Sequence, residues 1–178
     1  IWLDAHGDIN TDVTSPSGNI HGMPLSALMG MGSEELVNVY APGNKVAPQN
    51  VFLVGTRSLD EGESELIKRE HLSCYTMDAI REKGIGFVAE DIKLKLKERK
   101  IRNVHFSIDV DSIDPHYAPG TGTRVDNGLS PDQCFEFIDH ILSTNLVKSM
   151  DLVELNPELD IDESTTNLCL KLIDYITK

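Results

Sequence analysis

The sequence predicts a three-layer α/β/α fold, in which a mostly parallel sheet lies between two layers of helices. Short apolar runs alternate along the chain with longer segments that mix apolar and charged residues, a pattern typical of parallel strands joined by helices. Acidic residues directly follow three of the apolar runs. Sheets of this kind bind ligands at the carboxyl ends of their strands, so we expect a binding site at that edge.

The first third of the chain is expected to contain two strands. The apolar residues at 1–4 predict a strand that ends at Asp4. Residues 7–22 are rich in Asp, Asn, Ser, Thr and Gly and predict a loop, after which a short helix is expected at 24–29. The unbroken apolar run at 51–55 predicts a second strand that is buried on both faces.

The middle of the chain is expected to alternate helices with strands. Residues 61–70 predict a helix, 72–75 a strand and 77–83 a second, shorter helix. A longer helix is expected at 87–99, where apolar residues recur among charged ones. The β-favouring run at 104–109 predicts the next strand.

The last third is expected to add a helix, a strand and a final helix. Ser130, Pro131 and Gln133 mark a helix start, because Ser is a favoured N-cap, Pro fits the first turn and Gln completes a capping box. A strand is expected within 148–155, and the last helix at 165–176.

The composition excludes several classes of protein. With 178 residues, 40% of them hydrophobic, the chain is large enough for a sizeable core, and we expect a single domain over 1–178. A formal charge of −13 argues against nucleic acid as a partner, and no apolar run is long enough to span a bilayer. Three widely spaced cysteines are expected to be reduced thiols of a cytoplasmic protein: Cys74, Cys134 and Cys169. The chain opens inside a predicted strand, so we expect an N-terminal part of the fold to be missing.

Two acidic clusters have the spacing of metal ligands. Asp4, His6 and Asp8 are two residues apart, and so are Asp109 and Asp111. Alternate residues of an extended chain point the same way, so each cluster can direct its side chains at one place. Carboxylates at the ends of buried strands need a compensating positive charge. Oxygen ligands with a minority of imidazole favour manganese over zinc, and five ligands are more than one ion normally takes, so the clusters predict two manganese ions.

Two simpler interpretations of these clusters are weaker. An Asp-rich loop alone is commonly a turn or a helix cap, but here three acidic clusters follow successive strands, and the third contains Glu154. A calcium loop at 109–114 would need a different acidic spacing and a Glu at its twelfth position, which is Gly120.

Two longer motifs carry a resemblance to a known family. Residues 2–10 read Trp-Leu-Asp-Ala-His-Gly-Asp-Ile-Asn, and residues 107–115 read Ser-Ile-Asp-Val-Asp-Ser-Ile-Asp-Pro, followed by Ala-Pro-Gly-Thr-Gly-Thr at 118–123. These segments are similar to two signatures of the ureohydrolases, and the chain resembles the bacterial arginases within that family. The resemblance covers nearly the whole chain and implies the C-terminal portion of a ureohydrolase domain.

The resemblance implies an enzyme that uses two manganese ions to hydrolyse L-arginine to L-ornithine and urea. Asp4 and Asp109 would bridge the ions, Asp8 would complete the shell of one ion, and His6 and Asp111 that of the other. A hydroxide between the ions would attack the guanidinium carbon. The family's upstream Gly-Gly-Asp-His signature, which supplies a further His ligand, is absent, so we expect one ion to bind weakly and this fragment to be metal-poor or inactive. The family also forms trimers or hexamers, so we expect a homo-oligomer.

The resemblance also implies residues that recognise the substrate. The segment at 15–24 is similar to the loop by which arginases hold the α-carboxylate, and 54–60 matches the segment that contacts the α-amino group. Glu154 would pair with the guanidinium, and His21 would transfer protons. The implied substrate residues are Asn10, Ser17, Asn19, Asp60, Thr123 and Glu154, and the implied catalytic residues are His21, Asp109 and Glu154.

Two other functions stay open on the sequence alone. One is another ureohydrolase that acts on agmatine, guanidinobutyrate or formiminoglutamate, as agmatinase-like or formimidoylglutamase-like enzymes do. The other is a catalytically silent module that binds metal or forms oligomers. The loop at Ser17 to Asn19 favours arginine, because agmatine has no α-carboxylate for it to hold. Ser58 and Ser112 depart from the residues usual in the family, but neither is a predicted ligand.

Overall fold

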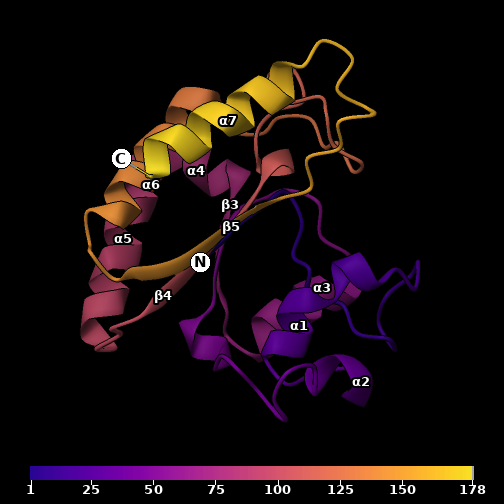
Figure 1. Ribbon diagram of the computed structural model, residues 1–178. Coiled ribbons are helices and arrows are strands. Elements are labelled where there is room, and N and C mark those ends of the chain that lie inside the picture. Colours follow the sequence, from indigo (N-terminus) through magenta and orange to yellow (C-terminus); the bar gives the residue numbers. More distant parts are fainter. Residues whose placement is uncertain (178) are drawn as a thin grey trace.

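Residues 1–177 are described by the computed structural model, which contains a five-stranded sheet in the order β3-β2-β1-β4-β5 (Figure 1). The strands are β1 (Trp2–Leu3), β2 (Phe52–Thr56), β3 (Ser73–Thr76), β4 (Val104–Asp109) and β5 (Val147–Val153). Every pair of neighbouring strands is parallel. The predicted α/β class with a mostly parallel sheet is therefore confirmed, and each predicted strand lies within a few residues of its expected bounds.

Seven α-helices accompany the sheet within residues 1–177. They are α1 (Pro24–Leu28), α2 (Glu34–Val37), α3 (Glu61–Arg69), α4 (Met77–Lys83), α5 (Ile85–Glu98), α6 (Pro131–Leu142) and α7 (Ser164–Ile176). The helix α2, a single turn capped by Ser33, is not predicted from the sequence. The helix α5 begins slightly earlier than predicted, at the buried Ile85 directly after Gly84. None of these helices is both long enough and apolar enough to cross a membrane.

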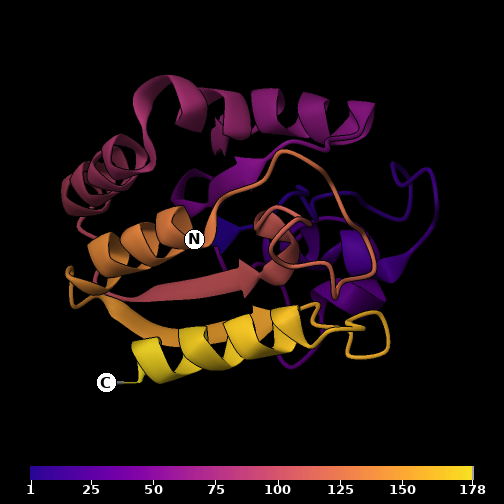
Figure 2. The same cartoon turned by 90° about the horizontal axis from the view of Figure 1, so that it is seen from above.

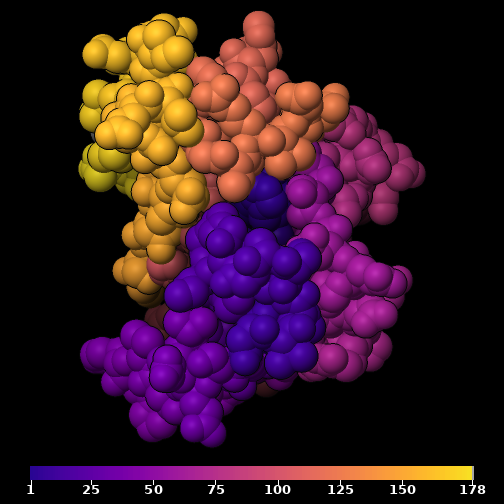
Figure 3. Space-filling view, turned by 90° about the vertical axis from the view of Figure 1, so that its right-hand side faces the viewer, coloured from indigo at the N-terminus to yellow at the C-terminus, as the bar shows by residue number. Residues whose placement is uncertain are grey.

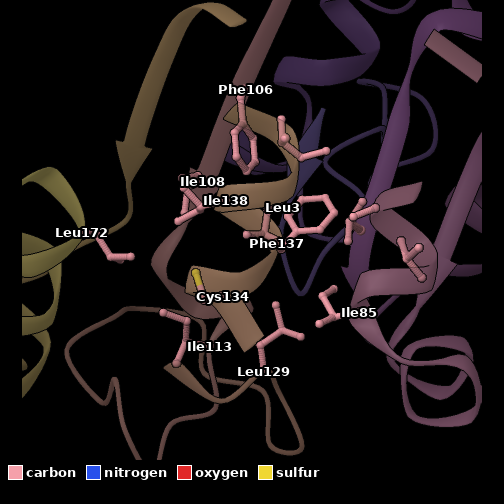
Figure 4. Packing of buried hydrophobic residues seen from close by; sticks show 14 of the residues in the cluster. Leu3, Ile85, Phe106, Ile108, Ile113, Leu129, Cys134, Phe137, Ile138 and Leu172 are labelled. Carbon is pink, nitrogen blue, oxygen red and sulfur yellow. The ribbon is translucent and has the colours of Figure 1, made fainter. Parts of the chain in front are cut away.

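One face of the sheet packs against α4, α5, α6 and α7 and forms the main core. Figure 4 shows Phe106 and Ile108 of β4 beside Phe137 and Ile138 of α6. The rings of Phe106 and Phe137 meet edge to face, with centroids 5.8 Å apart. In Figure 2, α7 (yellow) runs along the β5 edge, where Leu172 joins the same core. This core holds β4 in place, and the ligand-bearing segment follows β4 directly.

The opposite face of the sheet is covered only in part. There α1 and α3 pack against the β1–β2 half through a second core that includes Leu25 and Leu53. The same face of β4 and β5 exposes His105, whose ring nitrogens lie 2.8 Å from Ser149 Oγ and 3.1 Å from Asp151 Oδ2. The expected second helical layer therefore reaches only half of the sheet in residues 1–177. Polar side chains occupy the uncovered half, and these are stable in contact with water.

The Asp160 side chain caps the N-terminus of α7. Its buried carboxylate accepts hydrogen bonds from the N–H groups of Thr165 and Thr166, at 3.0 and 2.7 Å. Burial opposes the charged form, but the hydrogen bonds from Thr166 and Thr165 outweigh it and lower the pKa of Asp160 to about 2. The ionised carboxylate therefore contributes its full stabilisation at pH values above roughly 3.9, which is the pKa of an Asp in an unfolded chain. That contribution is lost as the pH falls through the folded value of about 2.

Asp160→Asn is expected to lower the free energy of unfolding at pH 7 by about 1 kcal/mol, a common value for a helix cap. Denaturant unfolding at neutral and at strongly acidic pH measures this effect, and the difference between variant and parent should shrink in acid. Glu158→Gln, at a nearby exposed carboxylate, is the matched control and should leave stability unchanged. An equal loss at both pH values would contradict a role for the charge of Asp160.

Candidate functional site

The segments that follow β1, β2, β4 and β5 line one pocket with a volume of about 540 Å³. Figure 3 shows the N-terminal segment (indigo) bordering the loop before α6 (orange), although the two lie far apart in the sequence. Every site residue predicted from the sequence lines this pocket except Asp4, which is buried. The predicted residues that line it are His6, Asp8, Asn10, Ser17, Asn19, His21, Asp60, Asp109, Asp111, Thr123 and Glu154.

Asp4 follows β1 directly and is only 1% exposed. Its Oδ1 accepts a hydrogen bond from the His6 N–H at 2.7 Å, and its Oδ2 accepts one from Trp2 Nε1 at 3.0 Å. Trp2 and Asp4 share a face of the sheet because alternate residues of a strand point the same way. The strand and its continuation therefore fix the orientation of this carboxylate from two sides.

The segment after β4 places a second pair of carboxylates. A 3₁₀ turn at Val110–Ser112 begins directly after Asp109, whose Oδ1 accepts a hydrogen bond from the Asp111 N–H at 2.8 Å. Asp111 Oδ2 lies 3.1 Å from His6 Nδ1 and accepts a hydrogen bond from Thr123 Oγ1 at 3.0 Å. The Asp111 carboxylate thus contacts both the segment after β1 and the loop that carries Thr123.

Asp4, His6 and Asp111 form a compact group that can hold a metal ion. One ligand atom from each residue lies within 4.8 Å of the other two. His6 Nδ1 is 3.4 Å from Asp4 Oδ1, in addition to its contact with Asp111. Asp8 and Asp109 line the same pocket, so all five predicted ligands belong to one region of the structure.

Burial and crowding shift the pKa values in this region. Burial, reinforced by the negative charge of Asp4, raises the pKa of Asp8 to about 8 and that of Asp109 to about 10. Burial opposes the protonated form of His6, but its contacts with Asp111 and Asp4 outweigh it and raise the pKa of His6 to about 10. Four carboxyl groups share this region with one imidazole, so Asp8 and Asp109 keep their protons at neutral pH, and a divalent cation bound beside them would favour their charged forms. Carboxylates with one imidazole form a donor set that fits a hard divalent ion such as manganese.

A second part of the pocket wall carries the residues predicted to recognise the substrate. Asn10 Nδ2 donates a hydrogen bond to Asp60 Oδ2 at 2.9 Å, which joins the segments after β1 and β2. Ser17, Asn19 and His21 lie on an exposed loop, where the Asn19 N–H donates to Ser17 Oγ at 3.2 Å. Amide and hydroxyl donors and one carboxylate therefore meet here, which suits the carboxylate and amino groups of an amino acid.

Two of the pocket residues have an unusual backbone conformation. Asp8 and Glu154 lie in the left-handed region, with φ values of 53° and 65°. Residues other than glycine rarely adopt this conformation, and those that do are concentrated at functional sites. Glu154 is exposed and follows β5, at the carboxyl edge of the sheet where the sequence predicts it.

Glu63 also lines the pocket and is not among the residues predicted from the sequence. Its Oε2 accepts a hydrogen bond from the Asp60 N–H at 3.0 Å, and its Oε1 accepts one from the Ile9 N–H at 3.3 Å. Gly7 passes so close that a Cβ at this position would lie 2.8 Å from Glu63 Oε1. Glu63 thus joins the segment after β1 to the start of α3. The capping-box spacing of Asp60 and Glu63 is the sequence signal that could have identified it.

Comparison with known sequences points to one family. The profile of the Arginase family matches residues 1–177. The chain is 44% identical to an arginase of Staphylococcus aureus over 173 residues, which are 97% of this chain and 57% of that protein. It therefore spans less than two thirds of the length of this relative.

Solved structures share the fold. The arginase from Bacillus cereus matches with a TM-score of 0.94 at 39% identity, over 98% of this chain and 60% of that one. The Entamoeba histolytica arginase, solved in complex with L-ornithine, matches with a TM-score of 0.91 at 36% identity, over 99% of this chain and 58% of that one. These matches confirm the predicted ureohydrolase-like arrangement of strands and helices.

Proposed function

The chain belongs to the Arginase family, and we propose that the protein hydrolyses L-arginine to L-ornithine and urea with two manganese ions. One observation carries this proposal: a single pocket joins the carboxylates around Asp111 to the polar loop that holds Ser17 and Asn19. The relative from Entamoeba histolytica, which shares the fold, binds the proposed product L-ornithine.

The five donors of the two acidic clusters would hold the metal ions. Asp4 and Asp109 would hold both ions, Asp8 would help to hold one of them, and His6 and Asp111 would help to hold the other. The raised pKa values of Asp8 and Asp109 support this arrangement, because buried carboxyl groups that lie close together resist ionisation until a cation lies beside them. When bound, manganese would supply a nucleophilic hydroxide near neutral pH.

The polar part of the pocket would orient the amino-acid end of the substrate. Asn10, Ser17 and Asn19 would donate hydrogen bonds to the α-carboxylate, and Asp60 would accept one from the α-amino group. The hydrogen bond between Asn10 and Asp60 supports this assignment, because it keeps the two groups of partners adjacent. This part of the pocket would thus select arginine over agmatine, which has no α-carboxylate.

The other end of the substrate would lie among Thr123, Glu154 and the acidic clusters. Glu154 would pair with the guanidinium cation through charge-assisted hydrogen bonds. As oxygen adds to the guanidinium carbon, the bond from that carbon to the side-chain nitrogen breaks and the departing amine takes up a proton. His21 at the exposed loop would carry that proton, since an imidazole can both accept and donate one.

Urea release from L-arginine after preincubation with manganese tests this function. The assay should compare residues 1–178 with the complete gene product, and L-arginine with agmatine. We expect urea from L-arginine, little from agmatine, and slower turnover by residues 1–178, whose acidic clusters hold only one imidazole. Asn19→Ala should raise KM for L-arginine by roughly tenfold, because it removes a hydrogen bond to a charged group, and leave the agmatine rate unchanged.

Two outcomes would overturn the proposal. Urea from agmatine without urea from L-arginine would identify a different ureohydrolase. Manganese bound without urea from any guanidino compound would identify a catalytically silent module.

Four further expectations stay predictions from the sequence. They are a cytoplasmic location, assembly into trimers or hexamers, the absence of nucleic-acid partners and a single domain.

A further inference from the structure

Arg57 lies directly after β2 and connects three segments around the pocket. It is half-buried, and the six hydrogen bonds that its guanidinium donates within residues 1–177 all end on main-chain carbonyls. Nη2 donates to Asp111 O at 2.8 Å and to Val125 O at 2.7 Å. Nε donates to the same Val125 carbonyl and to that of Asp126, and Nη1 donates to the carbonyls of Gly55 and Ser112. One side chain thus holds the end of β2, the turn after β4 and the loop that follows Thr123.

These acceptors require the forked shape of a guanidinium. Arginine presents five N–H groups in a fixed plane, whereas a lysine ammonium presents three donors at one point. Nη2 alone bridges two carbonyls that belong to different loops. A lysine at this position would keep the positive charge but could not bridge both loops in this way. The contribution of Arg57 is therefore geometric as well as electrostatic.

The backbone at Gly128 packs closely against the Arg57 guanidinium. A Cβ on Gly128 would lie 2.6 Å from Arg57 Nη2, 2.6 Å from the Asp114 backbone nitrogen and 2.8 Å from the Ile113 carbonyl carbon, so a larger residue there would disturb both the guanidinium and the backbone beside it. The same two loops are joined by backbone hydrogen bonds from the Asp114 N–H to Leu129 O at 2.9 Å and from the Leu129 N–H to Ser112 O at 3.0 Å. Arg57 thus holds the loops together on the side nearest Asp111 and Val125.

We propose that Arg57 is a positioning residue that fixes the predicted metal ligand Asp111 against Thr123. Both ends of the 3.0 Å hydrogen bond between Thr123 Oγ1 and Asp111 Oδ2 belong to segments that Arg57 holds. Loosening these segments would let the Asp111 carboxylate move away from His6, which lies 3.1 Å from it. The expected effect of Arg57 on manganese binding rests on the proposed function, whereas its clamping of the two loops does not.

Amide hydrogen exchange and manganese titration on Arg57→Lys test this inference. We expect the Leu129 and Asp114 amides to exchange at least about tenfold faster, because their loops lose a shared anchor. The Ser107 amide, which donates to Ile1 O within the sheet, should keep its rate. Manganese affinity should fall by about tenfold, as expected when a group that orients a ligand is lost. Arg69→Lys, at an exposed arginine of α3, is the matched control and should change neither value.

A second variant perturbs the same loop junction from its other side. Gly128→Ala should crowd both the guanidinium and the backbone at Asp114, and it should also speed the exchange of the Leu129 amide. Unchanged exchange in both Arg57→Lys and Gly128→Ala would overturn the inference. So would equal acceleration at the Ser107 amide, which would indicate a general loss of stability. If the parent binds no manganese, the metal assignment in the proposed function fails, and the exchange rates alone decide the role of Arg57.

Discussion

Asp109→Asn is expected to lower manganese affinity by roughly 100-fold or more and to abolish measurable urea release in the complete protein. The variant removes one of the two carboxylates proposed to lie between the ions. Burial and the neighbouring charges of Asp4 and Asp111 already raise the pKa of Asp109 to about 10. Asn resembles the protonated form of this residue, so we expect the metal-free variant to be at least as stable as the parent. The change should therefore separate metal binding from folding.

Three measurements check this expectation: manganese titration, urea release from L-arginine, and thermal unfolding without metal. Asp12→Asn is the matched control, because Asp12 is an exposed aspartate of the loop after β1 and does not line the pocket. It should bind manganese and release urea like the parent. Full urea release by Asp109→Asn would refute the assignment of Asp109 as a ligand. Loss of metal binding together with a large drop in the unfolding temperature would show that Asp109 acts on the fold instead.

Phe137→Ala is expected to lower the free energy of unfolding by about 3–5 kcal/mol, which is comparable to the whole stability of many domains. Phe137 lies fully buried on α6, and its ring meets Phe106 of β4 edge to face. Truncation would leave a cavity in the main core and remove the aromatic contact. Because the ligand-bearing turn begins at the end of β4, we also expect weaker manganese binding at temperatures near the unfolding transition.

Denaturant unfolding of Phe137→Ala measures this effect, with Phe87→Ala as the matched control. Phe87 is 56% exposed on α5, so its truncation should change the free energy of unfolding by less than about 1 kcal/mol. Similar values for the two variants would mean that the contact between α6 and β4 contributes little to stability.

Sequence reasoning identifies the elements that have strong local signals. The strand at β4 has the predicted bounds, Val104–Asp109, because its apolar residues end abruptly at a carboxylate. The capping box of Ser130 and Gln133 is present at the start of α6, as predicted. The short helix α2 is not predicted, since its single turn depends on the Ser33 cap and lacks a long apolar periodicity.

The site is predictable to the extent that its residues come from motifs. Alternation along an extended chain places Asp4 and His6 together, and the parallel sheet brings Asp111 beside them. Arg57 contacts the Asp111 carbonyl and Glu63 contacts the Ile9 N–H, and no sequence pattern indicates these distant backbone partners. The uncovered face at His105 is likewise a property of the packing. What the sequence leaves open are contacts that exist only after the chain has folded.

The central position of β1 has a consequence for how the chain folds. Trp2 pairs with Leu53 on one side and with Ser107 on the other, so the middle strand comes first in this chain and its neighbours come much later. Such long-range parallel pairing slows folding, because the chain must close large loops before it gains sheet contacts. During synthesis β1 would leave the ribosome before β2 and well before β4, so its β2 edge could pair first while its β4 edge stays unpaired. That edge of β1 is therefore expected to be open to incorrect pairing until residue 109 has emerged.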